Sequence, residues 1–171
     1  PDGRLAAIYR KIHLFDAMPD ERATPYRESA TTASGDAIVT AEMEGLRLGL
    51  ATCYDLRFPE LFRALALAGA EIFLLPSAFT AETGRHHWEP LVRARAIENG
   101  CFVVAPGQTG AHPPQRQCWG HSLIVDPWGD ILADAGTEPG MALAEIDTAR
   151  VAEVRRRIPS LANRRPDVYP R

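Results

Sequence analysis

Apolar and polar residues alternate along this chain in blocks that predict strands and helices in turn. In the segment 46–53, for example, Leu46, Leu48 and Leu50 fall on one side at period two, with the small residues Gly49 and Ala51 on the other. The predicted strands are 4–14, 37–44, 46–53, 71–79, 101–110, a hairpin over 121–134, and 141–147. The predicted helices are 58–70, 86–100 and 148–158. Residues 16–36 are rich in polar residues and proline, so we expect a long functional or poorly ordered loop there.

The order of these elements predicts the fold class. Strand, helix, strand and helix follow one another, and then come a hairpin, a strand and a helix. This succession is typical of a layered α/β fold with helices packed on sheets. Residues 1–171 are long enough for a single domain with its own core. The opening "PDGRLAAIYRK" is a turn signal followed directly by strand-like sequence, so we expect the chain to begin inside a domain.

Composition narrows the class of partner. Apolar residues make up 46% and charged residues 24% of the chain, and the net charge is −3. That balance predicts no nucleic-acid partner and no attachment to an anionic membrane. No apolar run approaches the length of a membrane span, and no secretory leader is visible. Three cysteines without a CxxC pair predict free thiols in a reducing, cytoplasmic setting, and their spacing predicts no metal site.

The stretch "LGLATCYDLRFPELF" (48–62) raises the main chemical question. Cys53 stands where a strand gives way to a helix. The partial positive charge of a helix N-terminus and the nearby cation Arg57 would lower the pKa of its thiol. Backbone N–H groups beyond Cys53 would face a developing oxyanion. The position predicts a nucleophile, although a buried filler cysteine is an equally simple interpretation of position alone.

Four separated motifs carry a resemblance that decides between these interpretations. They are "YRKIHLFD" (9–16), "CYDLRFPELFRAL" (53–65), "HWEPLVRARAIEN" (87–99) and "GHSLIVDPWG" (120–129). In this order they closely resemble the nitrilase superfamily of carbon–nitrogen hydrolases. The resemblance implies an α-β-β-α sandwich, truncated here at its N-terminus, that assembles into dimers or higher homo-oligomers. It also implies hydrolysis of a small-molecule amide without a cofactor.

The resemblance further implies roles for individual residues. Cys53 matches the nucleophile that forms a thioester, and Lys11 matches the lysine that, with the N–H of Tyr54, stabilises the oxyanion. Lys11 is the only lysine among 19 basic residues, which independently favours a role for a compact point charge there. Glu28 matches a second active-site glutamate that positions Lys11 or the amide. The family's general-base glutamate precedes the lysine motif, and we expect it to be absent from this chain.

The substrate class follows from the same motifs. The sequence looks most like the branch acting on ω-amides of keto acids, such as α-ketoglutaramate, or on deaminated glutathione. Both substrates carry carboxylates, and Arg57 is a natural bidentate partner for one; pairing of Arg57 with Asp55 or Glu60 is the alternative. Phe79 and Thr80 follow a buried strand and are predicted to line the pocket. Two alternatives stay open: an N-carbamoyl amino acid amidohydrolase, and a catalytically incomplete chain that binds a ligand or partner.

Overall fold

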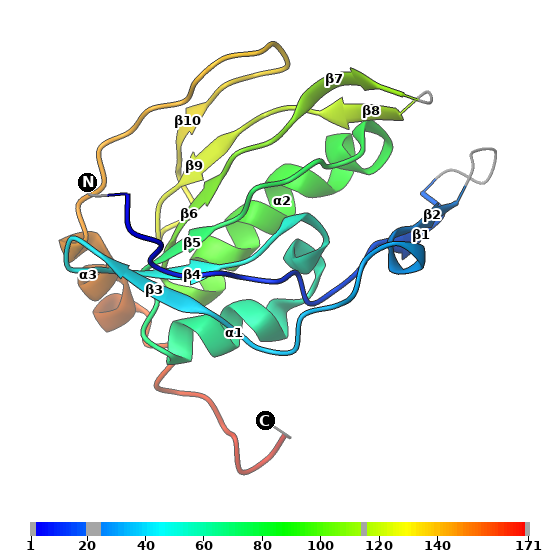
Figure 1. Ribbon diagram of the computed structural model, residues 1–171. Helices are drawn as coiled ribbons and strands as arrows, with labels where there is room; N and C mark the ends of the chain where they lie inside the picture. Colours follow the sequence, from blue (N-terminus) through cyan, green and yellow to red (C-terminus); the bar gives the residue numbers. More distant parts are fainter. Residues whose placement is uncertain (1–2, 20–24, 114–115, 170–171) are drawn as a thin grey trace.

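A six-stranded sheet with strand order β10-β9-β6-β5-β4-β3 forms the centre of the protein (Figure 1). The computed structural model describes residues 3–19, 25–113 and 116–169. Strands β4, β5 and β6 run parallel, and the outer strands β3, β9 and β10 pair antiparallel. The strands of this sheet are β3 (Thr40–Met43), β4 (Leu46–Leu50), β5 (Ile72–Leu74), β6 (Phe102–Ala105), β9 (Leu123–Val125) and β10 (Ile131–Asp134).

Two helices cover one face of this sheet. Helix α1 (Pro59–Leu67) connects β4 to β5, and helix α2 (Ala81–Asn99) connects β5 to β6. Between the helices and the sheet lies the main core, whose largest fully buried side chains include Trp88, Phe62 and Phe73. Burial of each such side chain stabilises the fold by about 1.5–3 kcal/mol. The helical layer therefore fixes the positions at which β4, β5 and β6 end.

A second apolar cluster lies on the opposite face. Successive strand residues point to opposite sides of a sheet, so Ile72 faces away from the helices that Phe73 contacts. Ile72 packs with Leu48, Phe102 and Val151, the last from helix α3 (Ala149–Arg157). Within the described ranges, none of the helices combines the length and apolar character that a membrane crossing requires.

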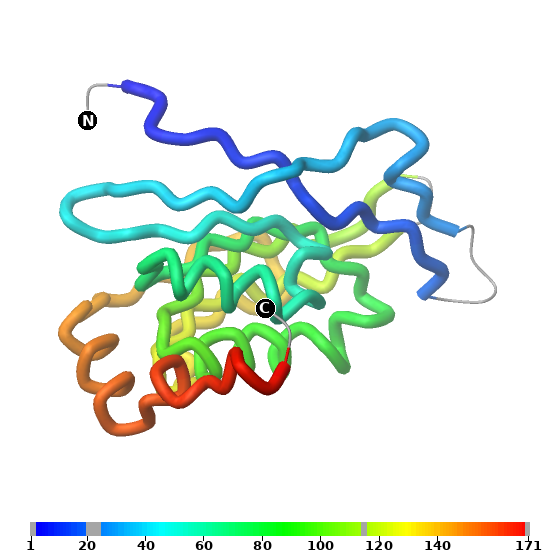
Figure 2. The backbone as a smooth tube through the Cα atoms, turned by 90° about the horizontal axis from the view of Figure 1, so that it is seen from below, coloured from blue at the N-terminus to red at the C-terminus, as the bar shows by residue number. Residues whose placement is uncertain are grey.

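Two small hairpins project at the same end of the sheet (Figures 1 and 2). The first is β1 (Asp16–Ala17) with β2 (Tyr26–Arg27), followed by the short 3-10 helix η1 (Glu28–Ala30). The second is β7 (Thr109–His112) with β8 (Arg116–Trp119). The first hairpin lies in the segment 16–36, where a loop was predicted. The strand predicted over 101–110 is shorter: β6 ends at Ala105, and β7 begins the second hairpin at Thr109.

Two predicted strands are wrong. Residues 4–14 and 141–147 form no strand, although both have strand-like composition. The N-terminal segment runs beside the β3–β4 hairpin (Figure 2) and is held by side-chain contacts and single backbone bonds, such as Gly35 N–H to the carbonyl of Lys11 at 2.7 Å. The pattern of side chains predicts which residues suit a strand. A strand forms only where its backbone also pairs with a neighbouring strand, and the local sequence does not specify that neighbour.

Candidate active site

A cavity of about 980 Å³ opens where the parallel strands β4, β5 and β6 end. Ligand sites of open α/β sheets characteristically lie outside these carboxyl ends. The lining described by the structure comes from the segments that follow the three strands, from the two projecting hairpins and from the residues that flank the first hairpin. It comprises Lys11, Phe15, Tyr26, Arg27, Glu28, Thr31, Thr52, Cys53, Pro76, Ser77, Ala78, Thr80, Pro106, Gly107, Gln108, His112, Pro113, Arg116, Gln117 and Cys118.

Cys53 follows the carboxyl end of strand β4 and has a strained backbone conformation. It begins the 3-10 helix η2 (Cys53–Arg57), and its φ of 49° lies in the left-handed region that non-glycine residues rarely adopt. Its N–H donates to the carbonyl of Pro76 at 3.0 Å, which ties this turn to the end of β5. Strained backbone of this kind concentrates at functional sites, where the surrounding structure holds it in place.

The electrostatics at Cys53 differ from the expectation. Burial raises the pKa of the Cys53 thiol, and this effect outweighs the lowering by the backbone of Ala78 and by the charge of Lys11. The predicted lowering is therefore wrong, because the thiol is largely removed from water. A thiol whose pKa is raised in this way needs a base before it can act as a nucleophile.

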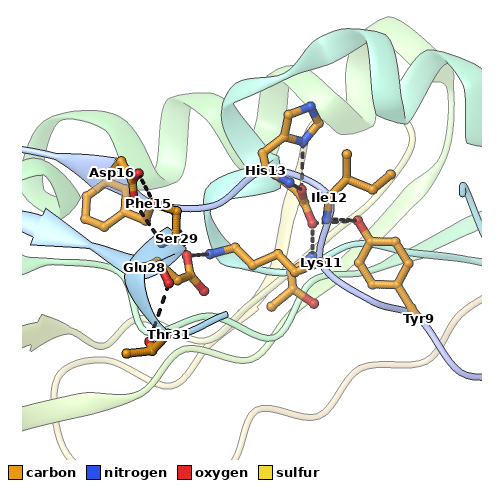
Figure 3. A network of polar contacts seen from close by, with 11 residues as sticks. Tyr9, Lys11, Ile12, His13, Phe15, Asp16, Glu28, Ser29 and Thr31 are labelled. Atoms are coloured by element: carbon orange, nitrogen blue, oxygen red, sulfur yellow. Dashed lines mark hydrogen bonds and ion pairs between the residues drawn. The ribbon is translucent and has the colours of Figure 1, made fainter. Parts of the chain in front are cut away.

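Lys11 and Glu28 form an ion pair on the wall of the same cavity (Figure 3). The Lys11 side chain is only 13% exposed, and its ammonium donates to Oε2 of Glu28. That oxygen also accepts the N–H of Phe15 at 2.6 Å, so Glu28 is itself fixed. The β1–β2 hairpin brings the two residues together, since Lys11 precedes β1 and Glu28 follows β2 directly. The three residues predicted as catalytic thus line one cavity.

Tyr54 presents its backbone, not its ring, to the thiol. A hydrogen bond from the backbone of Tyr54 contributes to lowering the pKa of the Cys53 thiol. Its ring packs against Phe15 and Phe58, with centroids 4.9 and 5.3 Å apart. Tyr54 lines a second, smaller hollow of about 20 Å³ that is also lined by Cys53.

Arg57, Phe79 and Thr80 line this smaller hollow, and only Thr80 also lines the main cavity. The Arg57 guanidinium lies over the Phe79 ring, 5.0 Å from its centroid, and Nη1 is 3.1 Å from Nδ1 of His87. Among the described residues no carboxylate forms an ion pair with Arg57, so pairing with Asp55 or Glu60 does not occur. Arg57 lies beside the Phe79 ring and His87, in the hollow that also reaches Cys53, and its role as a carboxylate partner stays a prediction.

Known proteins match the chain over nearly its whole length. Residues 1–156 match the carbon-nitrogen hydrolase family. The chain belongs to this family. It is 50% identical to a deaminated glutathione amidase of Synechocystis and 41% identical to human omega-amidase NIT2, over 96% and 99% of its length; it spans 61% of each relative. The crystal structure of the C. elegans NitFhit protein superposes with a TM-score of 0.91 at 46% identity, covering 98% of this chain and 41% of that one. The predicted nitrilase-type sandwich fold is confirmed.

In this carbon-nitrogen hydrolase chain, two arginines on the cavity wall escaped the sequence analysis. Arg27 ends β2, and Arg116 begins β8. The Arg116 guanidinium lies 4.2 Å from the centroid of the Tyr26 ring, so it joins the two hairpins across the cavity. Such a contact contributes about 0.5–1 kcal/mol at an exposed site. Neither "TGAH" (109–112) nor "RQCW" (116–119) alternates apolar and polar residues, so the sequence carries no clear signal for the second hairpin.

The charge of the cavity is positive overall. Among the described lining residues, Glu28 is the one carboxylate, and it is paired with Lys11. Arg27 and Arg116 contribute two further cations. A concave wall with this charge attracts anionic ligands.

Proposed function

We propose that this hydrolase is an amidase that converts a small carboxylate-bearing amide to acid and ammonia through a thioester on Cys53. The thiolate of Cys53 attacks the amide carbonyl, and the Lys11 ammonium with the N–H of Tyr54 stabilises the tetrahedral oxyanion. Ammonia leaves, and water hydrolyses the thioester. Glu28 holds Lys11 in place. The base that takes the thiol proton is, by family resemblance, a glutamate ahead of the lysine motif.

One observation carries this proposal: Cys53, Lys11 and Glu28, from three separate segments, line a single cavity at the carboxyl ends of parallel strands. The strained φ of Cys53 and the Lys11–Glu28 ion pair support it. Backbone strain is typical of functional sites, and the ion pair holds the Lys11 side chain in a defined position.

The positive wall of the cavity supports an anionic substrate. Arg27 and Arg116 line the main cavity and would meet a substrate carboxylate there, and Arg57 would act from the adjoining hollow. The names of the relatives, deaminated glutathione amidase and omega-amidase, describe amides of this class. We therefore extend the proposal to ω-amides of keto acids and deaminated glutathione.

Assembly and compartment belong to the same proposal. The three cysteines are free thiols, which supports a reducing, cytoplasmic setting. A homo-oligomer, dimer or larger, is proposed from the family resemblance, and light scattering of the purified protein tests it.

Ammonia release by the full-length protein tests the activity. The substrates are α-ketoglutaramate and deaminated glutathione, with propionamide as the uncharged amide and an N-carbamoyl amino acid as the ureido compound. We expect kcat/KM to be highest for the two carboxylate-bearing amides. Preference for the ureido compound, or no hydrolysis of any amide, would contradict the proposal.

A further inference from the structure

Asp55 is a fully buried carboxylate whose two oxygens are shared between the lysine segment and the cysteine turn. Its Oδ1 accepts the backbone N–H of His13 at 3.1 Å and lies 2.8 Å from Nδ1 of the same residue. Its Oδ2 accepts the hydroxyl of Tyr9 at 2.7 Å and the N–H of Thr52 at 2.8 Å. One side chain thus holds three positions in two segments far apart in sequence.

On the lysine side, Tyr9 and His13 flank Lys11 by two residues each (Figure 3). Residues 3–15 join no strand ladder, so hydrogen bonds of a sheet do not fix where Lys11 lies. The Tyr9 hydroxyl also accepts the N–H of Ile12 at 3.3 Å, and the His13 ring stacks on Phe58 with centroids 3.6 Å apart. Asp55 accepts from both flanking residues, and it therefore determines the register of this segment.

On the cysteine side, Asp55 closes the turn that begins with Cys53. Thr52 immediately precedes Cys53, and the Asp55 carboxylate fixes its N–H while the Asp55 N–H donates to the Thr52 carbonyl at 3.1 Å. These reciprocal bonds span the strained residue. The next part of the turn is anchored from α2, where Nε of Arg95 donates to the Leu56 carbonyl at 3.0 Å.

We infer that Asp55 is a positioning residue that sets the Lys11 ammonium against the Cys53 sulfur. The inference rests on the proposed roles of Lys11 and Cys53. Asp55 does not line the cavity, so it acts through the two segments and not on the substrate. A carboxylate whose two oxygens meet four polar groups is suited to this task, because each oxygen is held by groups on either side.

The substitution Asp55→Asn tests the inference in the full-length protein. An amide keeps the shape but replaces one acceptor oxygen with a donor, so either the His13 contacts or those of Tyr9 and Thr52 are lost. We expect kcat to fall about 100-fold, as for a displacement of roughly 1 Å, with KM changed less than about threefold because substrate contacts are untouched.

A double-mutant cycle with Lys11→Met separates positioning from simple destabilisation. If Asp55 acts by placing Lys11, Lys11→Met costs much less in the Asp55→Asn background than in the wild-type protein, where loss of an oxyanion donor costs about 100-fold or more. Full multiplication of the two losses would overturn the inference. So would a normal kcat per folded molecule in Asp55→Asn.

Two further variants keep the test decisive if Asp55→Asn folds poorly. Tyr9→Phe removes a single contact to Asp55 and should lower kcat about 10-fold, with the same reduced cost of Lys11→Met. The matched control is Asp126→Asn, a buried carboxylate in the β9–β10 turn that accepts the N–H groups of Trp128 and Asp130, at 2.9 and 2.8 Å. It should lose stability but keep kcat.

Activity persisting in Cys53→Ala would refute the proposed function itself. Unchanged kcat in both Tyr9→Phe and Asp55→Asn would refute only the positioning role of Asp55.

Discussion

The ammonium of Lys11 donates to the carboxylate of Glu28, and both side chains face the cavity that contains Cys53. The pair reduces the rotational freedom of the only lysine in the chain. A cation held in place before substrate arrives stabilises an oxyanion without reorganisation during the reaction.

Replacement of the nucleophile should abolish turnover. Cys53→Ala is expected to release no ammonia above background, because no thioester forms without the sulfur. The control is Cys101→Ala, a fully buried cysteine whose thiol contacts the Ala70 carbonyl and Arg155 outside the cavity. It should keep its kcat. Equal turnover by Cys53→Ala and the wild-type protein would remove the mechanism.

Replacement of Lys11 by arginine should also inactivate the enzyme despite the conserved charge. A planar guanidinium distributes its charge over a larger fork and cannot occupy the site of a compact ammonium. We expect kcat to fall about 100-fold or more. Arg85→Lys, the reverse exchange at an exposed position paired with Glu82, is the control and should be neutral. Near-normal rates for Lys11→Arg would argue against an oxyanion role.

The pH dependence of Cys53 alkylation should report its two charged neighbours. Burial raises the thiol pKa, so the rate of reaction with iodoacetamide should rise with pH through a midpoint above the ordinary thiol value. The Lys11 charge lowers this pKa and the Glu28 charge raises it. Lys11→Met should therefore move the midpoint up, and Glu28→Gln should move it down. Mass spectrometry of the Cys53 peptide measures both, and shifts of the opposite signs would show that the charges lie elsewhere.

Arg116 and Arg57 are two of the three arginines proposed to bind the substrate carboxylate, and they line different cavities. Arg116 lines the main cavity and Arg57 lines the adjoining hollow. Arg116→Ala is expected to raise KM for α-ketoglutaramate about 10-fold or more, as for loss of a charge-assisted bond, and to leave KM for propionamide unchanged. A larger selective effect of Arg57→Ala would assign the anchor to the hollow. Equal effects on charged and uncharged amides would remove the anchor from both, with Arg85→Ala as the neutral reference.

Packing of α2 against β8 depends on Gly84. A Cβ at this position would lie 2.4 Å from Cβ and Cγ of Trp119, at the base of a side chain that cannot swing away. Gly84→Ala should lower the free energy of unfolding by roughly 1–3 kcal/mol, less the gain in helix propensity of up to about 1 kcal/mol. Gly140→Ala, with its nearest contact at 3.8 Å, should be close to neutral in the same denaturant titration. Equal stabilities would mean that Trp119 moves freely.

The sequence predicted the parts of the fold that depend on local pattern. The apolar face of Leu61 and Leu65 predicted α1, and Asn99 with Gly100 predicted the end of α2, where Gly100 adopts the left-handed conformation. The strands at 4–14 and 141–147 were wrong because strand pairing depends on a distant partner. The 3-10 turn at Cys53 was also missed, since a short helix and the first turn of α1 share one pattern.

For the site, too, local motifs predicted which residues are candidates, while their arrangement depends on the folded chain. Motifs identified Cys53, Lys11 and Glu28, but only the fold shows that they line one cavity. The direction of the Cys53 pKa was predicted wrongly, because burial is a property of the folded chain and outweighs the local charges. The position of Arg116 depends on a hairpin that brings it to Tyr26, and no local pattern specifies that contact.

Trapping of the acyl-enzyme tests the central claim most directly. The full-length protein is mixed with α-ketoglutaramate, quenched in acid within the first turnovers and analysed by intact and peptide mass spectrometry. A mass increase equal to the acyl group, located on Cys53 and absent from Cys53→Ala, is the predicted result. Turnover without any adduct, or with the acyl group on another residue, would contradict a thioester mechanism at Cys53.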